Sequence, residues 1–146
     1  MKISVVQKQF VLFVALIFLA GCSTIAPFSQ KAYEQATSLK VDALAVMDKA
    51  SEPYSNQKQS VEALKLDVEK AFEYAKGRPQ NEVTTKQWAI IKDPTRNSLG
   101  GFLKRWEDKS TLEKPFIQEA KGIVSDGFDT VIELESGKRK PNEVQK

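Results

Sequence analysis

Residues 56–76 read NQKQSVEALKLDVEKAFEYAK, and the apolar side chains in this stretch recur at steps of three and four. Such spacing is typical of an amphipathic helix that buries one face. The apolar positions are Val61, Leu64, Val68, Ala71 or Phe72, and Ala75. Gly77 and Pro79 follow directly and are well suited to end a helix. The stretch therefore predicts a long helix that needs partners to cover its apolar face.

The same spacing occurs on both sides of this stretch. Residues 29–50 carry small and apolar side chains in register, with Ser29 as a candidate N-cap, and residues 115–136 carry a third stripe that ends at Gly137. The two outer stripes consist of Ala32, Ala36, Leu39, Ala43, Val46 or Met47 and Ala50, and of Phe116 or Ile117, Ala120, Val124, Phe128, Val131 and Leu134 or Glu135. The short break at residues 51–56 makes the first two helices antiparallel neighbours.

Two shorter helices are expected between the second and third long ones, at residues 84–92 and 98–108. Each carries one of the two tryptophans, and the Gly100-Gly101 pair is expected to weaken the second. No stretch has the two-residue period of a strand. We therefore expect an all-α domain at residues 30–137, an antiparallel bundle of three long helices plus two short helices between the second and third.

The N-terminal segment has the pattern of a targeting signal. Lys2 and Lys8 are its only charged side chains, and residues 10–20 form the apolar run FVLFVALIFLA. A helix that spans a bilayer needs about 20 residues, so this run is too short for that and suits the apolar region of a signal peptide.

The residues that follow are Leu19-Ala20-Gly21-Cys22, which closely resemble the lipobox of bacterial lipoproteins. The resemblance implies that residues 1–21 are a lipoprotein signal peptide and that residues 22–29 are a lipidated tether. It also implies that Cys22 carries fatty acyl chains such as palmitate on its sulfur and becomes the new N-terminus. Ser23 stands where an aspartate would retain such a protein at the inner membrane, so the resemblance implies the cell outer membrane, facing the periplasm in a Gram-negative host.

Composition excludes several kinds of function. The chain has no histidine and a single cysteine, so an internal disulfide and a thiolate zinc site are excluded and no metal or other cofactor is expected. Removal of Lys2 and Lys8 from the 22 basic side chains leaves one more basic than the 19 acidic side chains, a net charge of about +1. A nearly neutral mature chain is a poor candidate for nucleic-acid binding.

The best candidate contact site is the cluster at residues 102–106, FLKRW. Lys104 and Arg105 stand beside aromatic side chains and could meet a partner protein or anionic lipid headgroups, with Trp106 at the interface. The competing interpretation is that Phe102, Leu103 and Trp106 form an ordinary buried helix face. In that case only the two cations would point outward.

Two further patterns are weaker candidates for chemistry. Ser55 and Lys58 match the S-x-x-K pattern of penicillin-recognising enzymes, but the other motifs of those enzymes are absent. Asp126, Asp129 and Glu133 share one helix face without the calcium-loop pattern, so they predict a solvated acidic face. No catalytic residue is assigned.

The C-terminal segment, residues 138–146, reads KRKPNEVQK and predicts a basic disordered tail. Its Lys138-Arg139-Lys140 run could attract anionic cell-wall peptides or headgroups. Lys146 is the last residue, and the murein lipoprotein is joined to peptidoglycan through a C-terminal lysine. That resemblance rests on one residue.

Together these features predict a membrane-anchored lipoprotein that is a non-enzymatic binding or structural module at the cell envelope. Its membrane contact is the lipid on Cys22, and its further partner would be an envelope protein or peptidoglycan. One alternative is a small cell-wall-directed enzyme or hydrolase accessory that uses carboxylates, which requires a pocket holding two carboxylates with perturbed pKa values. Another is a self-associating helical spacer, since the sequence leaves the oligomeric state open.

Overall fold

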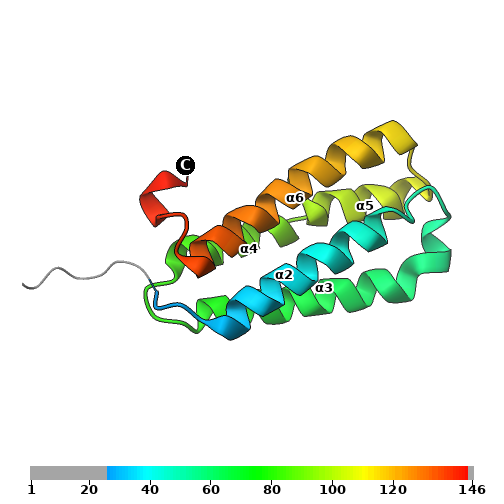
Figure 1. The fold of residues 1–146 in the computed structure, drawn as a ribbon. Helices are drawn as coiled ribbons and strands as arrows, with labels where there is room; N and C mark the ends of the chain where they lie inside the picture. The colour runs from blue at the N-terminus through cyan, green and yellow to red at the C-terminus, as the bar shows by residue number, and fades with distance from the viewer. Residues whose placement is uncertain (1–25, 145–146) are drawn as a thin grey trace, which may run out of the picture.

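The computed structural model describes residues 26–144, so the signal peptide and Cys22 lie outside the described residues. Between those limits the chain is helical and contains no strand, which confirms the all-α class (Figure 1). The elements are α2 (Gln30–Met47), α3 (Tyr54–Lys76), α4 (Glu82–Lys92), α5 (Leu99–Lys109), α6 (Lys114–Ser136) and a short 3-10 helix, η1 (Pro141–Glu143). Three are long, and the two short helices α4 and α5 follow the second long one.

Most helix ends follow the sequence signals. Ser29 caps α2, because its Oγ accepts a hydrogen bond from the Ala32 N–H at 3.3 Å. α6 ends at Gly137, whose φ of 72° lies in the left-handed region that favours glycine. The predicted end of the first helix was three residues too late, because Ala50 continues the buried stripe within the turn. Gly77 is not left-handed; in the loop after α3, the positive φ belongs to Gln80.

The three predicted stripes meet in one hydrophobic core. α2 packs against α3 and α6, while α4 covers the other side of α3 and α6. The core includes the residue pairs taken from the three stripes: Leu39 and Ala43, Leu64 and Val68, and Val124 and Val131. Among its largest fully buried side chains are Trp106, Phe128, Met47 and Leu103. Burial of these side chains supplies the main driving force for folding.

Two ion pairs join α2 and its C-terminal end to α6. Lys40 Nζ lies 2.6 Å from an Asp129 carboxylate oxygen, and Lys121 Nζ lies 2.5 Å from Asp48. The two segments run through these pairs in opposite order: Lys40 precedes Asp48, but the partner of Lys40, Asp129, follows Lys121, the partner of Asp48. The pairs are partly exposed, so each contributes at most about 1 kcal/mol to stability.

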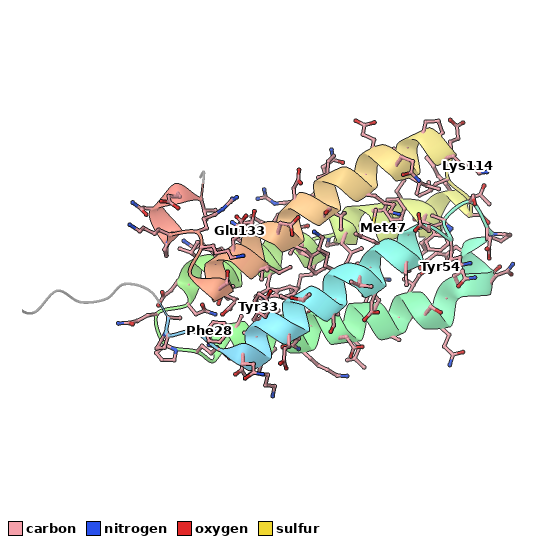
Figure 2. The ribbon with its side chains drawn as sticks, viewed as in Figure 1. Phe28, Tyr33, Met47, Tyr54, Lys114 and Glu133 are labelled. Atoms are coloured by element: carbon pink, nitrogen blue, oxygen red, sulfur yellow. The ribbon has the colours of Figure 1, made fainter. Side chains whose placement is uncertain are left out.

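At one end of the molecule, the α2–α3 loop is fastened to the α5–α6 loop. The Tyr54 N–H donates to the Ser110 carbonyl and the Leu112 N–H donates to the Ala50 carbonyl, both at 2.8 Å. Trp106 Nε1 donates to the Glu52 carbonyl at 3.0 Å. Figure 2 shows Met47, Tyr54 and Lys114 together at this end. We call it the loop end.

At the opposite end, a buried network joins three segments. Arg78 donates to the Glu135 carboxylate and to the Pro27 carbonyl, and Asn81 Nδ2 donates to Glu135 Oε1 at 3.3 Å and to the Ala75 carbonyl at 3.2 Å. The side chains of Arg78 and Glu135 are only 13% and 2% exposed. Full hydrogen bonding is what makes such a buried charge tolerable. Since the described chain begins here, we call it the tether end.

The Gly100-Gly101 pair has a packing role that the sequence did not reveal. A Cβ added at Gly100 would lie 2.3 Å from the Lys92 carbonyl oxygen, and one added at Gly101 would lie 1.8 Å from the Arg96 carbonyl oxygen. The glycines therefore allow the α4–α5 loop to fold directly against the first turn of α5. What was predicted as a weak point of the helix is a close backbone approach.

The tail is predicted to be disordered; within it the structure describes residues 138–144, which include η1. Arg139 Nη2 lies 2.6 Å from the Glu133 carboxylate, and the Lys140 N–H donates to Glu143 at 2.9 Å across η1. The ion pair to α6 and the turn at Pro141 hold this segment near the tether end (Figure 1). Lys146 lies outside the described residues.

Candidate functional site

The three candidate contact residues on α5 point in different directions. Lys104 and Arg105 are exposed, whereas Trp106 is fully buried. The Trp106 ring packs edge-on against the Tyr54 ring at 5.6 Å, and its only polar atom is already hydrogen-bonded. Trp106 as a partner or headgroup contact was therefore a wrong prediction; it is a core residue. The buried-face interpretation of the cluster holds, and it leaves two cations at the surface.

Lys104 and Arg105 differ in their surroundings. Lys104 donates to Asp108 one helical turn along, and this hydrogen bond raises the pKa of Lys104. The Arg105 guanidinium lies over the Phe116 ring, 4.3 Å from its centroid, and Phe116 in turn stacks on Phe102 at 6.0 Å. Among residues 26–144, Arg105 forms no ion pair with a carboxylate. Its planar donors remain open to a bound anion.

Lys104 also borders a groove that lies between α3, the end of α4 and α5. The groove has a volume of about 420 Å³. Its floor is apolar and its rim is charged: the floor consists of Val68, Pro94, Leu99, Gly100 and Leu103, and the rim consists of Lys65, Glu69, Lys92 and Lys104. We call it the α5 groove. Sequence reasoning missed it, because its walls come from three helices and no motif marks them.

The rim lysines of the α5 groove are held in place. Lys92 Nζ lies 2.6 Å from Glu69 and 3.9 Å from the centroid of the Phe72 ring. Burial is the largest single influence and disfavours the charged form of Lys65, but the 2.9 Å hydrogen bond to Glu62 together with the nearby charges of Tyr54, Glu62 and Glu107 raises the pKa of Lys65. Each of the three rim lysines is paired with a carboxylate, so the groove offers an apolar surface inside a rim of largely balanced charge.

A second hollow of about 400 Å³ lies on the other side of α5, between the α4–α5 loop and α6. Arg96 and Arg105 both line it. Arg96 Nε lies 3.5 Å from the Asp93 carboxylate, and two hydrogen bonds from Thr95 help to lower the pKa of Asp93. The exposed cations of α5 thus stand between two hollows.

The weaker sequence candidates acquire structural explanations. Ser55 and Lys58 are exposed on the first turn of α3, where nothing in the fold positions them as a catalytic pair. Asp129 and Glu133 are paired with cations, so the predicted acidic face is largely neutralised. Within the part of the chain that the structure describes, no cluster of three or more acidic or cysteine side chains could hold a metal ion.

Two carboxyl groups, those of Glu62 and Asp93, have shifted pKa values that bear on the enzymatic alternative. A general acid needs a carboxyl group with a raised pKa. A hydrogen bond from Lys65 lowers the pKa of Glu62, and hydrogen bonds from Thr95 lower that of Asp93. Both carboxyl groups therefore shift in the direction opposite to that of a general acid.

No protein-family model matches the chain, and no solved structure resembles it at a significant level. Within residues 26–144, none of the helices combines the length and the apolar character needed to cross a bilayer.

Proposed function

We propose that this chain is a membrane-anchored bacterial lipoprotein and a non-enzymatic binding module at the cell envelope. The anchor is inferred from Cys22 directly after Leu19-Ala20-Gly21 and the short apolar run. Two or three acyl chains suffice for stable attachment, since each buried methylene contributes about 0.8 kcal/mol. The binding role rests on one observation: the α5 groove, which combines an apolar floor with a rim of three lysines.

We also infer that the three long helices are antiparallel and form a bundle with the two short helices, in which α4 packs between α3 and α6. The reversed order of the Lys40–Asp129 and Asp48–Lys121 pairs supports this topology for α2 and α6. Such a bundle is a rigid scaffold, and recognition surfaces are commonly built on segments that a scaffold holds in place.

The partner of the α5 surface would be an anionic component of the envelope, either an acidic protein surface or peptidoglycan. Lys104 and Arg105 lie between the two hollows and are the cations best placed to meet it. The location that follows from Ser23 is the outer membrane, with the domain facing the periplasm.

The anchor is tested by labelling cells with a clickable fatty-acid analogue. Cys22→Ala should abolish labelling and block normal cleavage, because it removes the acylated thiol. Ser23→Ala is the matched control and should keep the label. Label retained by Cys22→Ala would rule out the lipoprotein assignment.

The binding role is tested by reversing the two exposed cations of α5. Lys104→Glu with Arg105→Glu should leave folding within about 0.5 kcal/mol of wild type, since exposed substitutions rarely cost more. Crosslinked capture of envelope partners should weaken, and added salt should weaken wild-type capture in the same way. Lys49→Glu with Lys58→Glu reverses two exposed lysines away from the groove and should leave capture unchanged. Equal capture by both double variants at every salt concentration would refute the site.

A further inference from the structure

Two aromatic side chains are exposed at the tether end, whereas the other described aromatic side chains of the domain are buried or half-buried. Phe28 is 63% exposed and Tyr33 is 36% exposed. Their ring centroids lie 6.3 Å apart, with the planes tilted by 49°. Figure 2 shows both at the start of α2, at the opposite end of the molecule from Tyr54 and Lys114. We call them the aromatic pair.

The aromatic pair lies close to the acylation site in the chain. This step rests on the proposed function, in which Cys22 carries the lipid. An extended chain covers at most about 3.6 Å per residue, so the four residues from Cys22 to Ala26 span no more than about 14 Å. The tether end of the domain is therefore held within about 14 Å of the acylated residue.

The buried network keeps the aromatic pair at this distance. Arg78 donates to the Pro27 carbonyl, one residue before Phe28, and the same guanidinium is fixed by Glu135. Phe28 therefore belongs to the rigid domain and moves with it. Tyr33 has the amphipathic ring found in the aromatic belts of membrane–water interfaces, and Phe28 adds apolar surface of the kind that interfacial helices bury among the headgroups.

Charge contributes less than the aromatic rings at this end. Lys31, Lys138 and Lys140 are exposed, but Glu34 and Glu82 are acidic neighbours at the same end. The opposing charges largely cancel. A contact here would therefore depend on the apolar surface of the rings more than on anionic lipid.

We propose that Phe28 and Tyr33 insert into the headgroup region of the bilayer and orient the domain on the membrane. In this orientation the long helices rise from the surface and the loop end is farthest from it. α5 leads into the loop end, so its C-terminal end lies far from the lipid (Figure 1). The lipid on Cys22 attaches the domain to the membrane, and the aromatic pair sets the orientation of the domain on it.

The experiment places a tryptophan at Phe28 in the full-length, acylated protein and reconstitutes it in phospholipid vesicles with bromine on the upper acyl carbons. Val41→Trp is the matched control, because Val41 is also 63% exposed on α2 but lies farther along the helix. Trp88 and Trp106 are buried and contribute the same background to both variants. Emission of Phe28→Trp should fall by about a third on brominated vesicles, since one of its three indoles reaches the interface. Val41→Trp should be unchanged.

Fatty-acid labelling of the same samples separates the two proposals. Acyl label without quenching of Phe28→Trp, or with equal quenching of Val41→Trp, overturns the orientation and leaves the lipoprotein assignment intact. Absence of label overturns both. Tyr33→Trp provides an independent second probe and should be quenched in the same way as Phe28→Trp.

Discussion

Gly101→Ala adds a single methyl group where, among the described glycines, an added Cβ would come closest to another backbone atom. The new Cβ would lie 1.8 Å from the Arg96 carbonyl oxygen, so the α4–α5 loop must move by more than 1 Å. Two hydrogen bonds hold that loop to the start of α5: Ser98 Oγ to the Asp93 carbonyl at 3.1 Å, and the Phe102 N–H to the Ser98 carbonyl at 2.9 Å. Their net contribution is about 1 kcal/mol each, and forced repacking costs a further 1–3 kcal/mol.

Alanine also favours the helix over glycine by about 1 kcal/mol, which offsets part of this cost. The net expectation is that Gly101→Ala lowers the free energy of unfolding by about 2–4 kcal/mol. Gly122→Ala makes the same chemical change in α6, where an added Cβ has nothing within 4 Å. It should raise the free energy of unfolding by about 0.5–1 kcal/mol.

The assay is urea-induced unfolding of both variants and wild type, followed by far-ultraviolet circular dichroism. The slope of the transition should stay the same and the midpoints should move in opposite directions. If Gly101→Ala is as stable as Gly122→Ala within about 0.5 kcal/mol, the close packing of the loop on α5 does not exist and the reasoning fails.

Three further outcomes are expected. Leu64→Ala should lower the free energy of unfolding by about 2–5 kcal/mol, because Leu64 is buried in the shared core; a loss below about 0.5 kcal/mol in urea titration would contradict that placement. Trp106→Phe should cost about 1–3 kcal/mol, because it leaves the Glu52 carbonyl without its indole donor, and thermal unfolding measures this loss. Since the folded-state pKa values of Glu62 and Asp93 are lowered, the stability they contribute is present above their unfolded-state pKa values and is lost as the pH falls through the lowered ones; urea midpoints taken from pH 7 down to pH 3 should decline less in the Glu62→Gln, Asp93→Asn variant.

The helices could be predicted from the sequence because their signals are local. Leu64 and Val68 lie one turn apart, and that spacing alone identifies a buried face. Gly137 marks the end of α6 for an equally local reason, since its backbone is left-handed and glycine adopts that conformation most readily. The helix lengths were less predictable, because a buried residue need not be helical. Ala50 is buried, but it lies in the turn after α2.

The site depends on contacts between residues far apart in sequence, which no pattern encodes. Lys65, Lys92 and Lys104 read as ordinary surface lysines, and only packing brings them to one rim. Glu135 was expected on the apolar face of the last helix, but its partner Arg78 is 57 residues away. The cluster around Trp106 was half predictable: its buried face follows the helical period, whereas the stacking of Arg105 on another helix does not.

The clamp of Arg78 on Pro27 and Glu135 also decides how mechanical force would pass through the protein. When an anchored domain is pulled by its partner, tension enters through the tether at Pro27. Without the clamp, that tension would peel α2 away one turn at a time, which needs little force. With it, the load passes through Arg78 to the ends of both α3 and α6, so several helices must yield together in shear. In the proposed anchored protein, the tether end would therefore spread a pulling force from the membrane over several helices.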